Sequence, residues 1–222
     1  GLSLGPMTLG LKRLVEPALR LTDLPKLDLV LLSHAHMDHF DIWTLRRLES
    51  KATAIITAIN TSSLLRPGKW SRVKELYWGE SARVGSLSVK AFPVQHWGAR
   101  MIADVKRGYN GYVIEGSGAR IIFGGDTAYT GTFKELKSTQ KFDLAIMPIG
   151  AYEPWVQAHC TPEQAWKMGS DAGAEFVLPV HHKTFKLGRE PREEPISRFH
   201  DVARGQDYRI AAREIGDAFA MA

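Results

Sequence analysis

Six consecutive residues, 34–39, read HAHMDH and offer the clearest chemistry in the sequence. Three imidazoles and one carboxylate are ligands that suit zinc, with manganese or iron as alternatives. In an extended turn, His34 and His36 project to the same side. Asp38 and His39 begin the next element and point elsewhere. The run is therefore predicted to serve two metal ions rather than one, and a polar surface loop with coincidental histidines is the alternative.

The apolar pattern around this run predicts a strand, a turn and a helix. Residues 27–32 are a short apolar run typical of a buried strand, and residues 41–48 have apolar side chains at helical spacing. Further strands are expected at 53–57, 73–77, 86–94, 111–115, 120–123, 142–147 and 175–180, and helices near 62–65, at 132–137 and from 161 to about 172. Several of these strands end at polar residues, which places a candidate site along one rim of the sheets.

Composition favours one compact domain over residues 1–222, because 44% of the residues are hydrophobic and 24% are charged. No apolar run reaches the roughly 18 to 20 residues that a membrane-spanning helix needs. Cys160 is the single cysteine, so any metal must be bound mainly by the eight histidines. A net charge of +5 favours an anionic partner, but there is no dense basic stripe of the kind that nucleic-acid binders carry.

The HAHMDH run resembles the signature of the metallo-β-lactamase fold hydrolases. The segments QHW, GYVIEG, FGGDTAY, MPIGAYEP and HHKTF are similar to the branch that holds N-acylphosphatidylethanolamine-hydrolysing phospholipase D and its bacterial relatives. This resemblance covers nearly the whole chain and implies an α/β fold, a four-layer αββα sandwich.

The chain departs from the family pattern at two places. The family commonly has Trp-Gly where this chain has His182-Lys183, so we expect a more basic site wall there. Family members also carry several strands before the first motif, whereas 33 residues precede His34. Either an upstream segment lies outside this sequence or part of one sheet is truncated.

The resemblance also implies a set of metal ligands. The family's later ligands are a His at a strand end, an Asp in a Gly-Asp turn and a His after a final hydrophobic strand. The matching residues here, in the same order, are His96, Asp126 and His181. The implied first metal site is His34, His36 and His96, and the implied second site is Asp38, His39 and His181, with Asp126 bridging the two.

The expected activity is that of a dinuclear zinc-dependent hydrolase, with a phosphodiesterase of the phospholipase D-like type favoured. Two metals about 3.5 to 4 Å apart can hold one hydroxide between them and clamp a phosphoryl or carbonyl oxygen. Asp38 would orient that hydroxide. The alternative enzyme is a lactonase or another carboxylic-ester or thioester hydrolase. A non-catalytic metal-binding protein and a nuclease rank below these, because a structural site normally has four ligands and no large nucleic-acid-binding insertion interrupts the chain.

Four residues outside the ligand set need a separate interpretation. His159 is predicted to act as a catalytic residue that contacts substrate or supports the ligands, and an ordinary surface histidine is the alternative. His182 would face away from its neighbour if the strand before it continued, which favours a structural role. Cys160 is expected to behave as a small hydrophobe, and His200 to lie on a helix without a functional partner.

Two clusters of basic residues follow candidate ligands. They are Lys183, Lys186, Arg189 and Arg192, and Arg100, Lys106 and Arg107. We interpret them as a basic rim that attracts an anionic small-molecule or lipid substrate, although such residues are usually just solvated. We expect a cytoplasmic protein, with peripheral membrane contact as the alternative. Because the sequence begins at Gly1 rather than Met, a targeting peptide would lie outside it.

Overall fold

Two β-sheets form the centre of the protein, which the computed structural model describes over residues 2–4, 7–9, 12–101, 104–138 and 140–221. The larger sheet contains β6 (Ser81–Val84), β7 (Leu87–Phe92), β8 (Gly111–Gly116), β9 (Ala119–Phe123), β10 (Phe142–Pro148) and β11 (Ala174–Val180). The smaller sheet contains β3 (Leu29–Leu31), β4 (Ala54–Ala58) and β5 (Arg72–Leu76). The strand orders are β11-β10-β9-β8-β7-β6 and β3-β4-β5, and the smaller sheet is parallel throughout.

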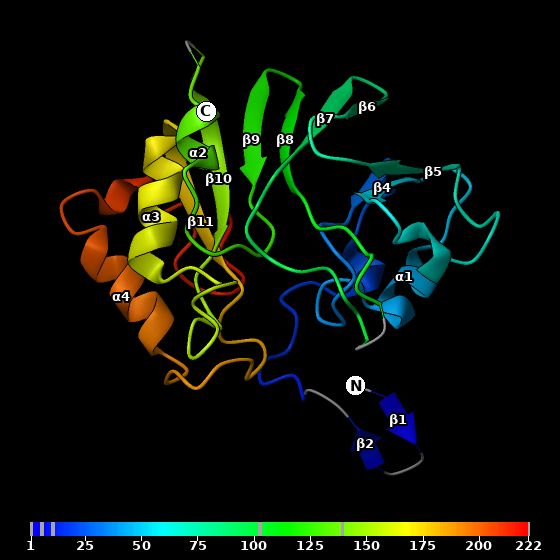
Figure 1. The fold of residues 1–222 in the computed structure, drawn as a ribbon, viewed down its shortest axis with the longest axis horizontal. Coiled ribbons are helices and arrows are strands. Elements are labelled where there is room, and N and C mark those ends of the chain that lie inside the picture. The colour runs from blue at the N-terminus through cyan, green and yellow to red at the C-terminus, as the bar shows by residue number, and fades with distance from the viewer. Residues whose placement is uncertain (1, 5–6, 10–11, 102–103, 139, 222) are drawn as a thin grey trace.

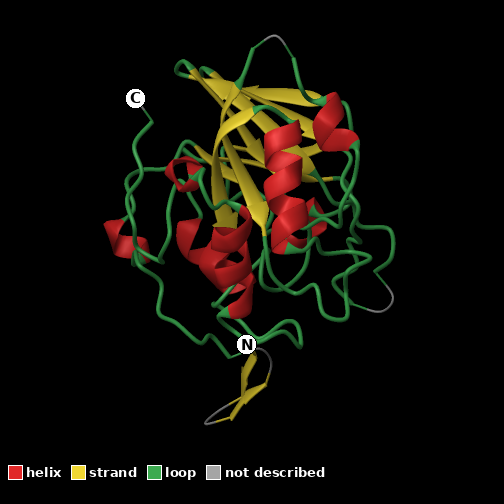
Figure 2. Ribbon diagram, turned by 90° about the vertical axis from the view of Figure 1, so that its left-hand side faces the viewer, coloured by secondary structure: helices red, strands yellow, loops and turns green. Residues whose placement is uncertain are grey.

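Helices cover the outer faces of both sheets. The α-helices are α1 (Ile42–Leu48), α2 (Thr132–Glu135), α3 (Pro162–Asp171) and α4 (Glu194–Val202). In Figure 1, α1 lies beside the smaller sheet, and α2, α3 and α4 lie beyond β10 and β11 of the larger one. Figure 2, seen from that second side, shows helices in front of the strands. The expected αββα sandwich is therefore confirmed.

Three groups of buried apolar side chains correspond to the three contacts between these four layers. One group, including Ile122, Phe142, Trp166 and Phe199, lies between the larger sheet and the helices α3 and α4. A second, including Phe40, Leu45, Ile55 and Trp70, packs α1 on the smaller sheet. The third, including Ile56, Leu76, Val89 and Tyr112, lies between the two sheets. Each sheet is thus covered on both faces by apolar contacts.

Local sequence signals explain several of these elements. Thr161 caps α3 by accepting a hydrogen bond from the Gln164 backbone N–H, and the Gln164 side chain accepts one from Thr161, which is the expected capping box. β8 and β9 form the expected hairpin, and its turn residues Ser117 and Gly118 both have positive φ. None of the helices in the described part of the chain is long and apolar enough to cross a membrane.

Some expected elements were wrong in type or extent. The helix expected near residues 62–65 is a single 3-10 turn, Ser62–Leu64, because the apolar run is too short to support an α-helix. The helix expected at 132–137 ends at Glu135. The edge strand β6 was not predicted, since its side chains are alternately exposed and half-buried and carry little apolar signal. A short antiparallel hairpin, β1 (Leu2–Leu4) and β2 (Met7–Leu9), was not predicted either.

Tyr112 links the two sheets through a buried hydrogen bond. Its hydroxyl, on β8, donates to the backbone carbonyl of Leu32 just after β3 at 2.9 Å, and accepts from the Asn110 side chain at 3.1 Å. Replacing Tyr112 with Phe removes the hydrogen bond to the Leu32 carbonyl and the one from the Asn110 side chain. We therefore expect the free energy of unfolding to fall by about 1 to 3 kcal/mol. Denaturant unfolding measures this change. Tyr208→Phe, at a residue that is 75% exposed, should leave stability unchanged, and an equal loss in both variants would contradict the role of the Leu32 contact.

Candidate metal centre

The HAHMDH run lies where the chain leaves β3 and turns toward α1. The backbone N–H groups of His39 and Phe40 both donate to the His36 carbonyl, which makes a tight turn. The fully buried Phe40 ring anchors this turn in the core below α1. The Arg100 guanidinium donates to the carbonyls of Ala35 and Phe40 at 2.8 and 2.9 Å. Arg100 therefore shapes the ligand-bearing turn, and its assignment to a basic rim was wrong.

The other candidate residues come from the loops that follow strands of the larger sheet. His96 follows β7, Asp126 follows β9, and His181 follows β11. Thr127 ties these loops together, because its hydroxyl accepts from the Gln95 backbone at 3.0 Å and its carbonyl accepts from the Cys160 backbone at 2.7 Å. The site is thus assembled across the meeting edge of both sheets.

Gly125 lets the Asp126 turn approach the smaller sheet closely. Its φ is +59°, a region that favours glycine, and a Cβ here would lie 2.9 Å from the Asn110 carbonyl oxygen and 2.9 Å from the Ser33 Cβ. Any larger residue would push the turn away from Ser33, the residue before His34. The glycine before Asp126 is therefore required by the packing as well as by the turn.

The structure brings all seven predicted ligand residues together in two groups. Each residue offers one ligand atom, and within each group these atoms lie within 4.8 Å of one another. The first group is His34, His36, His96 and Asp126, and the second is Asp38, His39, Asp126 and His181. This is the same division that the family resemblance implies, with Asp126 shared between the groups.

One oxygen of Asp126 stands at the centre of the cluster. Its Oδ2 atom lies 3.0 Å from His39 Nε2 and 3.2 Å from His181 Nε2. The same oxygen is 3.8 Å from His34 Nε2 and 3.9 Å from His96 Nε2. The carboxylate is almost completely buried, so its charge acts on these imidazoles with little screening by water.

Burial keeps most of the imidazoles neutral. It lowers the pKa of His34 and His36, and lowers the pKa of His96 to about 3. Burial also raises the pKa of Asp126, but the charges of His181 and His39 outweigh it and hold that pKa well below its usual range. For His39, burial lowers the pKa, but Asp126 outweighs it and raises the pKa to about 10. The first group therefore presents neutral imidazoles beside an ionised carboxylate, the protonation states that metal binding requires, whereas His39 must release its proton when a cation binds.

The remaining polar atoms of the cluster also fit divalent cations. His34 Nδ1 is hydrogen-bonded to Ser33 Oγ at 2.9 Å, and His96 Nδ1 donates to the Ala158 carbonyl at 2.9 Å, which directs the Nε2 atom of each ring into the cluster. In the described residues, Asp126 Oδ1 is buried without a hydrogen-bond partner. Such an atom is costly in a protein interior, and a cation beside it would satisfy it. The donor set fits two metal ions.

His159 also lies in this cluster. It is buried, its Nδ1 is 3.9 Å from Asp126 Oδ2, and its ring stacks on that of His181 with centroids 5.4 Å apart. Burial lowers the pKa of His159 to about 4. Its Nδ1 has no hydrogen-bond partner within the described part of the chain. The surface alternative for His159 is therefore wrong.

Trp97 is a site residue that sequence reasoning missed. The centroid of its ring lies 4.4 Å from the ring centroid of His96, 4.8 Å from that of His36 and 5.9 Å from that of His159. The residue is nevertheless 41% exposed. A large apolar side chain that is half open to solvent beside a ligand cluster forms a wall that substrate can touch. Its position directly after His96 was the signal that could have found it.

The segment after β11 differs from expectation. β11 ends at Val180 and His181 has a φ of +62°, so the strand alternation that would turn His182 away does not continue. Lys183 does not make the wall more basic, because its amine pairs with Glu193 at 2.9 Å and with Glu214 at 3.1 Å.

Two further sequence interpretations concern Arg107 and Cys160. Arg107 pairs with Asp104 at 2.8 Å, so it too was wrongly assigned to a rim. Cys160 is buried and its thiol donates to the Pro148 carbonyl, which confirms its expected behaviour as a small hydrophobe.

A cavity of about 330 Å³ opens from the second ligand group. We call it the site cavity. Its polar lining includes Asp38, His39, Asp126 and His181, and its apolar lining includes Phe123, Ile146, Val180, Phe185 and Leu187. Arg13 also lines it, with its guanidinium 5.1 Å from the centre of the Phe185 ring. The site cavity thus offers charged and apolar surface side by side.

Comparisons with known proteins agree with this geometry. A family model described as "Beta-lactamase superfamily domain" matches residues 4–182. An uncharacterized protein of Mycobacterium tuberculosis is 34% identical over 212 residues, which cover 91% of this chain and 56% of that protein. N-acyl-phosphatidylethanolamine-hydrolyzing phospholipase D 1 of Caenorhabditis elegans is 32% identical over 210 residues, covering 83% of this chain and 58% of that protein. The chain therefore spans a little over half the length of these two relatives.

Solved structures show the same fold. The metallo hydrolase Igni18 of Ignicoccus hospitalis superposes with a TM-score of 0.69 at 22% identity, covering 92% of this chain and 84% of that one. The residues matched by the family model include both ligand groups and His159. The chain belongs to the beta-lactamase superfamily and has the metallo-β-lactamase fold.

Proposed function

We propose that this chain is a dinuclear metal-dependent hydrolase that cleaves a phosphodiester, in the manner of the phospholipase D-like branch. The observation that carries the proposal is the shared carboxylate, Asp126, between two groups of ligand atoms at the meeting edge of the sheets. Two adjacent sites are the arrangement that in-line displacement at phosphorus uses. The name of the Caenorhabditis elegans relative supports a phosphodiester substrate.

We propose zinc as the metal, with manganese or iron as alternatives, because imidazoles and carboxylates without thiolates suit all three. The residues that would hold the ions are His34, His36 and His96 in one site, Asp38, His39 and His181 in the other, and Asp126 in both. When bound, the two ions would supply the Lewis acidity that activates water and polarises a phosphoryl or carbonyl oxygen.

Asp126 and Asp38 supply the negative charge of the site. Asp126 offsets positive charge in both groups from a position that solvent barely reaches. Asp38 Oδ2 lies 3.3 Å from both His39 Nε2 and His181 Nε2. Burial raises the pKa of Asp38, but hydrogen bonds from His181 and His39 outweigh it and hold the pKa far below its usual range. Asp38 is therefore ionised at neutral pH and can accept a hydrogen bond that orients the attacking water.

His159 is the chain's best candidate for a contact with substrate oxygen. Its pKa of about 4 makes the ring neutral at pH 7, so one ring nitrogen carries a proton and the other is free. The ring is held between His96 and His181, with centroid distances of 4.9 and 5.4 Å. We propose that His159 hydrogen-bonds a substrate or leaving-group oxygen as charge develops there.

The anionic substrate is proposed to be a small molecule or a lipid, and the site cavity supports both through Arg13 and its apolar wall. A lactonase or another carboxylic-ester or thioester hydrolase is the second candidate, because the same residues would polarise a carbonyl oxygen. A non-catalytic metal-binding protein is the third.

Metal removal tests the proposal. We expect the purified chain to bind about two metal ions and to hydrolyse bis(p-nitrophenyl) phosphate and N-acyl phosphatidylethanolamines. A chelator should lower turnover by about 100-fold or more, and zinc or manganese should restore it. Metal content by mass spectrometry and release of p-nitrophenol are the measurements. Metal-loaded protein that cleaves only lactones or thioesters would favour the second candidate, and protein inert toward every substrate would favour the third.

A further inference from the structure

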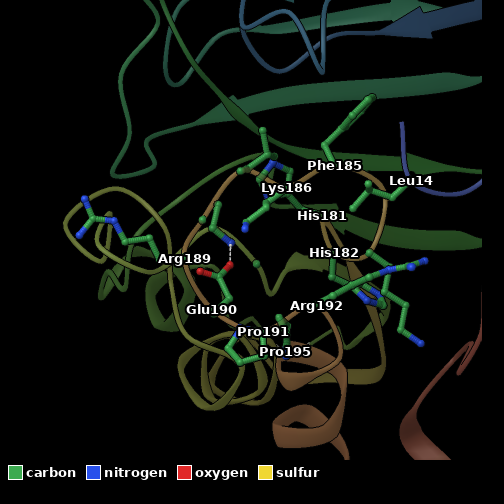
Figure 3. A pocket seen from close by; sticks show the side chains of 15 residues that line it. Leu14, His181, His182, Phe185, Lys186, Arg189, Glu190, Pro191, Arg192 and Pro195 are labelled. Atoms are coloured by element: carbon green, nitrogen blue, oxygen red, sulfur yellow. Dashed lines mark hydrogen bonds between the residues drawn. The ribbon is translucent and has the colours of Figure 1, made fainter. Parts of the chain in front are cut away.

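A second cavity adjoins the site cavity on the far side of His181. Its volume is about 350 Å³, and it lies among residues 150–151 and 181–195 with Leu14 at one edge (Figure 3). We call it the side cavity. The two cavities share four lining residues, which are His181, His182, Phe185 and Leu187. The side cavity therefore lies directly beside the second ligand group, because His181 belongs to the lining of both cavities.

Basic side chains dominate the lining of the side cavity. Four cations line it, Lys183, Lys186, Arg189 and Arg192, against one carboxylate, Glu190. The charge of Lys183 is already balanced by Glu193 and Glu214. Figure 3 shows the Arg189 side chain directed away from the cavity. Lys186 and Arg192 are the two remaining cations of the lining, and both are exposed to solvent at its rim.

These two cations are poorly compensated by the protein. Among the described residues, Lys186 has no carboxylate within ion-pair distance, and the nearest carboxylate to Arg192 is Glu193, at 3.7 Å from its Nε. Glu190, the one acidic residue of the lining, is held in the wall by the backbone N–H groups of Ala151 and Glu153, at 2.5 and 3.2 Å from its oxygens, and its single charge offsets one of the two cations. The side cavity is left with excess positive charge.

We propose that the side cavity binds a second oxyanion of the substrate, a phosphate group carried by the same molecule whose ester lies at the metal centre. The proposal rests on the proposed function, because the scissile ester must lie beside His181. Lys186 and Arg192 are the residues that bind this second group. Arg13, in the site cavity, lies beside Phe185, which lines both cavities, and adds to the attraction. The preferred substrate is thus a phosphodiester with an additional phosphate, rather than one with a single charge.

A matched pair of probes isolates the second phosphate. Thymidine 3′,5′-bisphosphate and thymidine 5′-monophosphate differ only in that group, and calorimetric titration of each against the full chain needs no turnover. We expect the bisphosphate to bind about tenfold more tightly or better. The double variant Lys186→Gln, Arg192→Gln should lose about tenfold of that preference. Arg189→Gln is the matched control, because it removes an exposed cation of the same segment whose side chain points away.

Equal affinity of the wild type for the two probes would overturn the proposal. An equal loss in the double variant and in Arg189→Gln would overturn it too, because the preference would then come from general surface charge. Lys186→Arg should keep the preference, which separates charge from any change in folding. Titration of chelator-treated chain repeats the comparison without metal. A chain that hydrolyses no ester but still prefers the bisphosphate would contradict the proposed function and would still support the oxyanion site.

Discussion

Asp126→Asn is expected to lower turnover by about 1000-fold or more and to reduce the bound metal below two ions per chain. The substitution keeps the size of the side chain and removes the charge that faces both ligand groups. Asparagine also brings an amide N–H₂ group that can turn toward His39 and His181, whose Nε2 atoms lie 3.0 and 3.2 Å from Asp126 Oδ2. Metal content and kcat on bis(p-nitrophenyl) phosphate are the measurements.

Asp201→Asn is the matched control for this change. Asp201 lies on α4, its side chain is 63% exposed, and it pairs only with Arg204 within the described residues. It should keep both metal content and turnover. Full metal content and near-normal turnover in Asp126→Asn would show that Asp126 does not bridge two metals, and the order of ligands after His39 would have to be reassigned.

His159→Ala is expected to lower kcat by about 100-fold while the metal content and the melting temperature stay close to those of the wild type. The reason is geometric. His159 faces the cluster through a nitrogen 3.9 Å from Asp126 Oδ2, but it belongs to neither group of potential metal ligands. Removing it should therefore take away a contact with substrate oxygen and leave both groups intact. Steady-state kinetics with parallel metal analysis separates the two effects.

His200→Ala serves as the control for His159, because His200 lies on α4 and in neither ligand group. It should leave kcat and metal content unchanged. If His159→Ala lost metal in proportion to activity, His159 would be a ligand rather than a substrate contact. If kcat did not change, its position in the cluster would have no catalytic meaning.

The ligand cluster could be predicted from sequence because its parts are local. HAHMDH follows an apolar strand directly, and both Asp126 and His181 come where a buried strand ends. Since strand ends gather at one rim of a sheet, residues placed there meet without any knowledge of side-chain packing. The layer order of the sandwich followed from the family resemblance. The treatment of residues 1–222 as one domain stays a prediction.

What escaped prediction depends on contacts between distant residues or on where a strand stops. From the sequence alone, Lys183 is interpreted as a free cation, because its partner Glu214 lies 31 positions later in the chain. His182 reads as an outward residue because strand alternation was assumed to continue past Val180. Arg100 reads as a surface charge, although it donates to two carbonyls more than 50 residues earlier in the chain. The role of Trp97 could not be predicted, because it depends on packing against three histidine rings that come from different parts of the chain.

The assembly of the site from both sheets ties folding to metal supply. The smaller sheet brings the HAHMDH run, and the larger one brings His96, Asp126 and His181, so each ligand group needs both sheets in place. A cation that binds only the assembled site stabilises it by about 1.4 kcal/mol for every tenfold rise in free metal above the dissociation constant. The midpoint of thermal unfolding should therefore rise with free zinc. In a cell short of metal, the same sequence would populate its folded state less and would meet proteases more often.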